Sequence, residues 1–222
     1  MIIAGIDYSK NSPGIVKFFI DDKDFSITKK EYLGITAVKA KNPKPPIGEH
    51  CIRFCDKDMD DYEKINIMSD NAVEFVKDCD YIGIENYSYS SAGRVFDLAE
   101  TTGVLKWRLY NNNKTLRLYS PSVIKMFASG NGNADKDIML KYYKADGNKL
   151  NIPEQYISDH PYEDIIDAYF IAQLLYTEMA LRKGFIVMKD LSEQQIRPFN
   201  HVTKSQTVNL LNQEFLRKKT VG

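Results

Sequence analysis

The stretch YEDIIDAYFIAQLL, residues 162–175, predicts a helix with a strong apolar stripe and two carboxylates near its start. Asp164 and Asp167 are three residues apart, which on a helix places both side chains on one face, about one turn apart. Two like charges at this spacing repel each other, and burying either beside apolar neighbours is costly unless another group pairs with it. The helix therefore raises the question of what compensates its two aspartates.

Bulk composition indicates a globular protein of one large or two small domains. The chain has 222 residues, of which 43% are hydrophobic, enough for a sizeable core. No apolar run approaches the length of a membrane span, and the N-terminus MIIAGIDYS lacks the layout of a signal peptide. Cys51, Cys55 and Cys79 are too few for a disulfide framework and indicate a reducing compartment, so we expect a cytoplasmic protein.

Charge is distributed unevenly along a chain whose formal net charge is zero. Residues 51–103 contain 5 Lys and Arg against 12 Asp and Glu, whereas residues 104–149 contain 9 against 3. Residues 180–222 are also basic, with 8 against 3. Basic segments suit a polyanion, because Lys and Arg contacts to phosphate supply most nonspecific affinity for nucleic acid. A solvated surface with scattered lysines explains the charge pattern about equally well.

Hydrophobic periodicity predicts strands and helices in alternation. The expected strands are 2–8, 14–20, 25–33, 81–85 and 116–120. The expected helices are 61–78, 92–111, 121–128, 134–144 and 162–182. Residues 36–58 contain KNPKPPIG, which no helix or central strand tolerates, so we expect a loop insertion there. Residues 183–222 form a polar C-terminal extension, partly helical, with a helix expected at 205–218.

This order of elements predicts an α/β fold with one mixed sheet and helices on its faces. Asp7 ends the first strand and Glu85 ends the fourth, and ligand sites form at the carboxyl ends of strands in such sheets. If the two strands are neighbours, Asp164 and Asp167 on the last helix would complete a cluster of four carboxylates. Oxygen ligands of this kind suit Mg²⁺ or Mn²⁺, and two such ions can hydrolyse a phosphodiester.

Each acidic residue also has a simpler explanation. Asp7 could cap a turn, Glu85 could form a surface ion pair, and Asp164 could favour the helix N-terminus through the helix dipole. These explanations are reasonable for the residues taken singly. They leave the placement of all four, at two strand ends and on one helix face, as a coincidence.

The sequence resembles the RuvC family of Holliday junction resolvases, which has the RNase H-like fold. Four blocks carry the resemblance in family order across residues 2 to about 180: IAGIDYS, YIGIENYSYSSAG, PSVIKMFASGNGNADKDIM and EDIIDAYFIA. The first two contain Asp7 and Glu85 at the family's strand-end carboxylates, and the last contains Asp164 and Asp167 at its helix pair. The family's basic segment corresponds to the third block, with Lys125 and Lys136.

The resemblance implies a five-stranded sheet, three strands antiparallel and then two parallel, within an RNase H-like nuclease domain at 1–182. It implies a homodimer that nicks four-way DNA junctions symmetrically, with two Mg²⁺ ions per site (Mn²⁺ substituting), no small-molecule cofactor and no membrane. The residues expected to be catalytic are Asp7, Glu85, Asp164, Asp167 and Lys136, the four acids being the metal ligands. The residues expected to contact DNA are Lys125, Lys136, Asn133, Tyr87, Tyr89 and Arg94. The helix at 92–111, with Val95, Leu98, Ala99 and Trp107, is the candidate dimer interface.

The basic segment has a chemical logic of its own. Gly130 and Gly132 allow a loop with backbone amides open to phosphate, and Asn133 is the expected N-cap of the next helix. Lys136 then lies in the first helical turn, where the helix dipole also favours anions. Taken without the resemblance, the same loop is more simply an ordinary surface loop with two lysines.

The chain departs from the bacterial enzyme in the insertion at 36–58 and in the extension after 183. Two tyrosines, Tyr87 and Tyr89, straddle the position of the family's junction-probing aromatic residue, so that role is not assigned to either. These additions and the Asn-, Lys- and Tyr-rich composition favour a viral, bacteriophage relative. A broader debranching nuclease acting on Y-shaped and flapped DNA, and a non-cleaving module that binds branched DNA, are the alternative functions. An actin-like ATPase is disfavoured because no second glycine-rich phosphate loop follows.

Overall fold

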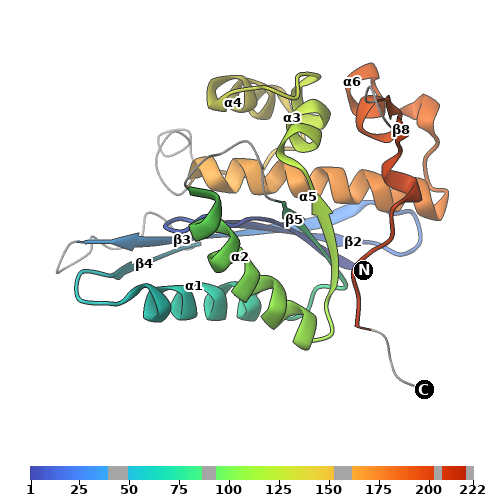
Figure 1. The fold of residues 1–222 in the computed structure, drawn as a ribbon. Coiled ribbons are helices and arrows are strands. Elements are labelled where there is room, and N and C mark those ends of the chain that lie inside the picture. The colour runs from blue at the N-terminus through green and yellow to red at the C-terminus, as the bar shows by residue number, and fades with distance from the viewer. Residues whose placement is uncertain (40–49, 87–93, 153–161, 203–206, 219–222) are drawn as a thin grey trace.

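The computed structural model describes residues 1–39, 50–86, 94–152, 162–202 and 207–218, and the account below concerns these residues (Figure 1). One mixed sheet has the strand order β4-β3-β2-β1-β5-β6. Its strands are β1 (Ile2–Asp7), β2 (Gly14–Ile20), β3 (Ile27–Val38), β4 (Cys51–Cys55), β5 (Tyr81–Glu85) and β6 (Thr115–Tyr119). β1, β2 and β3 are antiparallel neighbours, whereas β5 runs parallel to β1, and β6 runs parallel to β5. The α/β fold class expected from the sequence is confirmed, with six strands instead of five.

The sixth strand corrects the expected loop insertion at 36–58. β3 continues to Val38, and Cys51–Cys55 forms β4, which pairs with β3 in parallel from Gly34↔Cys51 to Val38↔Cys55. The edge of β3 offers backbone donors and acceptors, and residues 51–55 satisfy them by pairing in parallel. Only the proline-rich part, within residues 40–49, lies outside the described residues.

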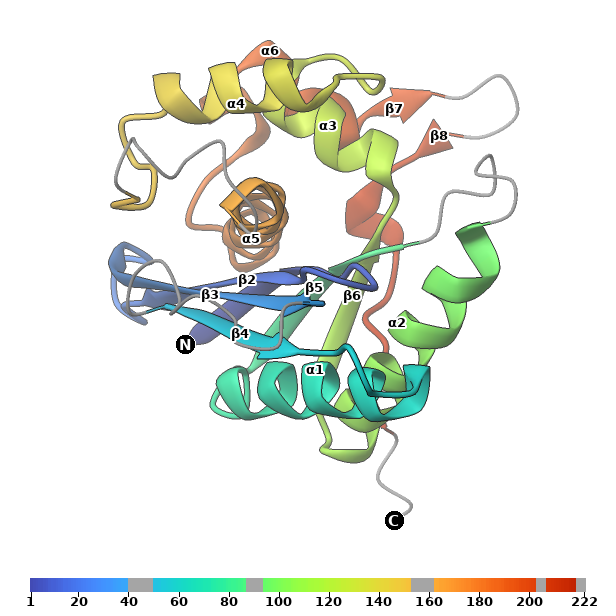
Figure 2. The same ribbon diagram turned by 90° about the vertical axis from the view of Figure 1, so that its left-hand side faces the viewer.

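Helices cover both faces of the sheet. They are α1 (Asp61–Phe75), α2 (Arg94–Asn111), α3 (Pro121–Ser129), α4 (Lys136–Ala145), α5 (Tyr162–Lys183) and the short α6 (Glu193–Ile196). Figure 2 shows α5 end-on against one face, with α3 and α4 stacked outside it, and α1 and α2 on the opposite face. Two separate apolar cores result. One lies between α5 and the sheet and contains Phe18 and Ile171. The other lies between α1 and the sheet and contains Ile6 and Met68.

Two glycines let α5 lie directly on the sheet. A Cβ atom at Gly5 would lie 2.3 Å from both the Ala168 carbonyl oxygen and the Ala172 nitrogen. A Cβ atom at Gly14 would lie 2.3 Å from the Asp164 carbonyl oxygen. Any side chain at either position would force the helix away from β1 and β2. The absence of a side chain at these two positions therefore sets how closely the start of α5 approaches the strand ends.

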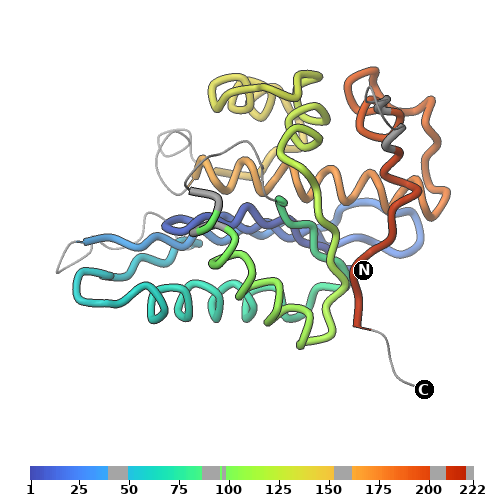
Figure 3. The backbone as a smooth tube through the Cα atoms, in the orientation of Figure 1, coloured from blue at the N-terminus to red at the C-terminus, as the bar shows by residue number. Residues whose placement is uncertain are grey.

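The C-terminal extension packs on this body and differs from the expected helix at 205–218. Its described elements are α6, three 3-10 turns (Met188–Asp190, Arg197–Phe199 and Leu210–Asn212) and two short strands, β7 (His201–Val202) and β8 (Thr207–Val208). Figure 3 traces the extension along β6, where Leu216 exchanges two backbone hydrogen bonds with Leu116. Arg117 donates to the carbonyl of Leu210 at 2.8 Å, an oxygen that also accepts from the Gln213 amide within its 3-10 turn. The arginine contact therefore fixes this turn against β6.

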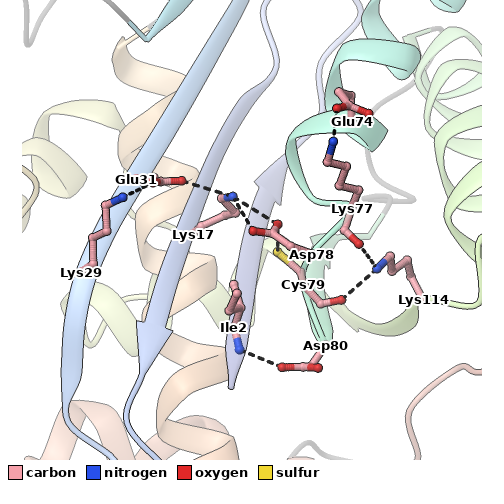
Figure 4. A network of polar contacts seen from close by, with 10 residues as sticks. All are labelled: Ile2, Lys17, Lys29, Glu31, Glu74, Lys77, Asp78, Cys79, Asp80 and Lys114. Carbon is pink, nitrogen blue, oxygen red and sulfur yellow. Dashed lines mark hydrogen bonds and ion pairs between the residues drawn. The ribbon is translucent and has the colours of Figure 1, made fainter.

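A charged network lies toward the end of the sheet where β1 and β5 begin, away from their carboxyl ends (Figure 4). Lys17 on β2 is only 6% exposed, and its ammonium lies 3.2 Å from both Glu31 and Asp78 and over the Phe75 ring. Burial alone would lower the pKa of Lys17, but the hydrogen bonds to Asp78 and Glu31 raise it above its ordinary value. The network thereby ties the turn after α1 to β2 and β3.

We expect Gly5→Ala to destabilise the fold by about 3 kcal/mol, because the new methyl group meets backbone atoms that cannot rotate away. Gly147→Ala is the control, since a Cβ there meets nothing within 4 Å. The measurement is the free energy of unfolding in urea. Equal stability of the two variants would show that α5 does not lie on β1 as described.

Candidate active site

Strand pairing brings the first two predicted carboxylates together. β1 and β5 are parallel, with Ile6 opposite Ile84, so the next residue on each strand, Asp7 and Glu85, lies at the same edge of the sheet. Their carboxyl groups share a hydrogen bond. Asp7 is also the partner of Gly14 across the β1–β2 pair, which places it under the start of α5.

The first two turns of α5 add the other two carboxylates. Asp7, Asp164 and Asp167 each place one carboxylate oxygen within 4.8 Å of the others. Glu85 joins this group through its hydrogen bond to Asp7. Asp7, Asp164 and Asp167 therefore form one cluster with Glu85 beside Asp7, contributed by two strands and one helix that are far apart along the chain.

Ser12 is a site residue that the sequence did not reveal. Its hydroxyl donates to Asp164 Oδ2 at 2.5 Å, and both side chains are buried. Ser12 lies in the turn between β1 and β2, 152 positions from Asp164, and nothing in the local sequence SKNSPG marks it as a partner of the last helix. Its hydrogen bond holds Oδ2 of Asp164, whereas Oδ1 of Asp164 lies 4.0 Å from the Lys136 ammonium.

Burial and mutual repulsion make the cluster hard to ionise. Burial raises the pKa of Asp7, and the negative charges of Glu85, Asp167 and Asp164 raise it further. Burial also raises the pKa of Glu85, although its hydrogen bond to Asp7 and the nearby Lys125 act in the opposite direction. The pKa of Asp167 is raised from 3.8 to about 7 by burial and by Glu85 and Asp164. A group of carboxylates with such values is stabilised in its ionised form by cations.

The donor set fits hard divalent cations. Every grouped atom in the cluster is a carboxylate oxygen, and no histidine or cysteine joins it among the described residues. Oxygen-only ligand sets suit Mg²⁺, Mn²⁺ or Ca²⁺ and disfavour ions that prefer sulfur or nitrogen.

Two lysines face the cluster across a cleft of about 190 Å³. The cleft lies between β5, α3, α5 and the start of α4, and apolar side chains line it together with Glu85, Lys125, Asp135, Lys136 and Asp167. Both lysines lie near enough to lower the pKa of Asp167. The walls of this cleft therefore carry positive charge beside the carboxylates, an arrangement that suits a phosphate group between them.

Lys136 is held by an ion pair with Glu163, another residue missed from the sequence. Its ammonium lies 2.6 Å from Glu163 Oε2, and its side chain is 58% exposed. Burial lowers the pKa of Lys136, but the carboxylates of Glu163, Asp164 and Asp167 raise it above its ordinary value. Exposed pairs of this kind contribute little to stability, so Lys136 can exchange Glu163 for another anion at small cost.

The expected N-cap of α4 is wrong. Asp135, not Asn133, caps the helix by accepting a hydrogen bond from the Ile138 amide. Asn133 lies in an exposed turn in which the Asn131 side chain accepts from its amide at 3.0 Å. The helix therefore begins at residue 136, two residues later than the expected start at 134. Lys136 is the first residue of α4 and so lies in the first helical turn, where it was expected.

The remaining predicted DNA contacts cannot be placed. Tyr87 and Tyr89 lie outside the described residues, and Arg94 begins α2 without a described side chain. These three assignments stay predictions. Within the described part of the chain, no helix combines the length and the hydrophobicity needed to cross a membrane.

Comparison by sequence finds no match to a family model and none to a curated protein. Comparison by structure finds Thermus thermophilus RuvC, with a TM-score of 0.51 and 16% identity over 83% of this chain and 98% of that chain. The same protein in complex with a Holliday junction substrate matches with a TM-score of 0.53, 16% identity, and coverage of 83% and 97%. A Fowlpox virus resolvase with Holliday junction DNA has a TM-score of 0.49 and 10% identity over 81% of this chain and 99% of that chain. The chain therefore has the RuvC-like, RNase H-like fold, with a six-stranded sheet.

Proposed function

We propose that this protein is a divalent-metal-dependent endonuclease that resolves four-way DNA junctions by paired symmetric nicks. The observation that carries the proposal is the convergence of four carboxylates from β1, β5 and α5 opposite Lys125 and Lys136. The RuvC-like fold supports the same conclusion, since the similar Thermus thermophilus protein is described in complex with a Holliday junction substrate.

In this proposal Asp7, Glu85, Asp164 and Asp167 would hold two Mg²⁺ ions. When bound, such ions activate water and stabilise the leaving oxygen of a phosphodiester. Ser12 keeps Asp164 in its ligating orientation through the 2.5 Å hydrogen bond. Lys125 and Lys136 orient the scissile phosphate and stabilise the negative charge that develops on it.

Two matching nicks require two active sites, so we propose a homodimer. We also propose residues 1–182 as the nuclease unit and 183–222 as an extension packed on it. A viral, bacteriophage origin and a cytoplasmic location remain predictions from composition. A non-cleaving DNA-binding module is disfavoured, because a scaffold has no use for a cluster whose members repel one another.

The decisive experiment uses a synthetic four-way junction with each strand labelled in turn. We expect cleavage only with Mg²⁺ or Mn²⁺, at symmetry-related positions on two opposing strands, read on a sequencing gel. Y-shaped and flapped DNA form the second arm, and linear duplex forms the third. Equal rates on junctions and Y-shaped DNA would favour the debranching alternative, and binding without cleavage in any metal would favour the binding module.

Asp7→Asn should abolish cleavage while junction binding survives. The substitution removes a metal ligand, whereas affinity comes mainly from phosphate contacts elsewhere on the surface. Single-turnover cleavage and a gel-shift titration of the same preparation measure the two effects, and circular dichroism confirms that the variant folds. Turnover close to that of the parent protein would remove Asp7 from the mechanism.

Lys136→Ala should slow cleavage more than it weakens binding. Losing one phosphate contact lowers the magnitude of the salt slope of log K by only about 0.9, whereas charge stabilisation in the transition state shows up in the rate. Lys141→Ala is the matched control, since it removes an exposed lysine from the same helix. An equal fall in rate and affinity for Lys136→Ala would make this lysine an ordinary docking contact.

Mg²⁺ should stabilise the fold more at high pH than at low pH. Because the pKa of Asp167 is about 7 in the folded chain and near 3.8 when unfolded, folding takes up protons in this window. Stability of the metal-free protein is therefore present at low pH and is lost as pH rises through about 7. Bound Mg²⁺ offsets this loss, so the increase in Tm on adding Mg²⁺ should grow from about pH 5 to about pH 8.

Asp167→Asn is the control for this measurement, because it removes both the titrating group and one metal ligand. We expect its Tm to change less with pH and to respond less to Mg²⁺. An increase in Tm that is independent of pH in both proteins would place the metal elsewhere.

A further inference from the structure

One side chain on the buried face of α1 is charged. Lys64, Met68 and Ala72 follow one another at helical spacing, and all three are buried. Burying an ammonium group costs free energy unless polar groups replace the water that it loses. Here these groups come from two other segments, because the Lys64 ammonium lies 3.1 Å from Oδ2 of Asp56, just after β4, and donates to Oδ1 of Asn11 at 2.5 Å. Lys64 therefore joins α1 to the end of β4 and to the turn between β1 and β2.

The ion pair between Lys64 and Asp56 is a poor source of stability. Their side chains are only 10% and 8% exposed, yet Oδ1 of Asp56 is buried and has no hydrogen-bond partner among the described residues. A buried ion pair offsets the desolvation of its charges only when further hydrogen bonds satisfy both groups, and two apolar side chains are often as stable. The role of this pair is therefore to be found in the side chain that it holds, that of Asn11.

Asn11 and Ser12, which are neighbours in the turn between β1 and β2, bind helices on opposite faces of the sheet. The Asn11 side chain accepts from Lys64 of α1, and the Ser12 hydroxyl donates to Oδ2 of Asp164 on α5 at 2.5 Å. Figure 2 shows these two helices on either side of the sheet. The turn therefore lies between the two contacts, and a displacement of the Asn11 side chain moves Ser12 as well.

Strand β3 fixes the backbone on both sides of Ser12 but leaves one motion open. The Ala37 amide donates to the Asn11 carbonyl and the Ile35 amide donates to the Pro13 carbonyl, each at 3.0 Å. Both bonds are made to the same strand, so the turn can still tilt about the line that joins them, toward α1 or toward α5. The contact of the Asn11 side chain with α1 opposes this tilt.

We propose that Lys64 is a positioning residue for Asp164 and acts through Asn11 and Ser12. By holding the Asn11 side chain, Lys64 keeps the Ser12 hydroxyl on Oδ2 of Asp164 and so fixes the orientation in which this carboxylate joins the cluster. The role requires no contact of Lys64 with a metal ion or with DNA. The inference rests on the proposed function in one respect, that the carboxylates of the cluster hold metal ions.

Asp164 gains from this support because its neighbours repel it. One carboxylate oxygen from each of Asp7, Asp164 and Asp167 lies within 4.8 Å of the others, and like charges at this distance favour turning a carboxylate away. A carboxylate that has turned away must be turned back when a metal ion binds, which lowers the affinity. Replacing a residue that hydrogen-bonds a metal ligand typically lowers metal affinity about 10- to 100-fold.

The test measures Mn²⁺ affinity without DNA, from the electron paramagnetic resonance signal of the free ion. Asn11→Ala removes the acceptor of Lys64 from an exposed turn position and leaves the buried ion pair intact. We expect it to weaken Mn²⁺ binding about threefold or more, as for residues coupled within one hydrogen-bond network.

Asn66→Ala is the matched control. Asn66 is exposed on α1, and its Oδ1 also accepts from a cation, Arg108, at 2.5 Å. This variant should bind Mn²⁺ as the parent protein does. Affinity equal to that of the parent in Asn11→Ala, or an equal loss in both variants, would overturn the proposal.

A double-mutant cycle shows whether Asn11 acts through Ser12. Ser12→Ala alone should weaken Mn²⁺ binding about tenfold or more. In that background Asn11→Ala should have little further effect, because the hydroxyl through which it acts is gone. An equal effect of Asn11→Ala with and without the Ser12 hydroxyl, or an unchanged affinity in Ser12→Ala, would refute the positioning role.

Removing the whole ion pair separates positioning from stability. Lys64→Met alone would leave Asp56 buried without its cation, so it is combined with Asp56→Leu. The free energy of unfolding in urea should stay close to that of the parent or rise, whereas Mn²⁺ affinity should fall by the same factor as in Asn11→Ala. A double variant that loses stability but keeps its Mn²⁺ affinity would make Lys64 a structural residue only.

Because these measurements use no DNA, the positioning role and the proposed function can fail separately. A chain that shows the coupling of Asn11 with Ser12 but cleaves no junction would refute the proposed function and leave the positioning role standing. A chain that cleaves junctions while these two residues contribute independently to Mn²⁺ affinity would refute only the positioning role.

Discussion

The contact between α5 and the glycines of β1 and β2 is the constraint on which the site depends. Gly5 and Gly14 bring the helix backbone to the strands at a distance that no side chain permits. This approach sets Asp164 and Asp167 beside Asp7, while the parallel pairing of β1 with β5 adds Glu85. The carboxylates therefore owe their proximity to backbone packing and sheet register, both of which form when the domain folds. The protein need not rearrange to assemble its cluster, which is the preorganisation that electrostatic catalysis requires.

The same helix buries acidic groups in two different ways. Near its end, Glu178 is fully buried, and its carboxylate accepts hydrogen bonds from Arg117, Tyr119 and Arg182. That carboxylate is compensated within the chain, and its partners Arg117 and Arg182 also hold the C-terminal extension at the Leu210 carbonyl. Near its start, carboxylates face other carboxylates, and the pKa of Asp167 is raised to about 7. One end of α5 thus has its buried charge compensated within the chain, whereas the other gains stability from cations.

Much of this arrangement follows from the sequence, because the relevant signals are local or periodic. The strands at 14–20 and 81–85 and the long helix from 162 were predicted closely, and strand-end carboxylates plus a two-aspartate helix face indicated the cluster. β4 was missed because a five-residue edge strand beside prolines has little periodicity and depends on the open edge of β3. The C-terminal extension was misjudged because distant arginines bind its carbonyls. Ser12 and Glu163 were missed because their roles are set by partners far along the chain.

Anomalous scattering from crystals grown with Mn²⁺ would show directly whether the four carboxylates hold two metal ions. We expect two anomalous peaks between Asp7, Glu85, Asp164 and Asp167, about 3.5–4 Å apart as in other two-metal sites. Both peaks should be lost or weakened in Asp7→Asn crystals grown under the same conditions. Mn²⁺ bound elsewhere on the chain, with the cluster empty at saturating metal and neutral pH, would show that the carboxylates are not a two-metal site.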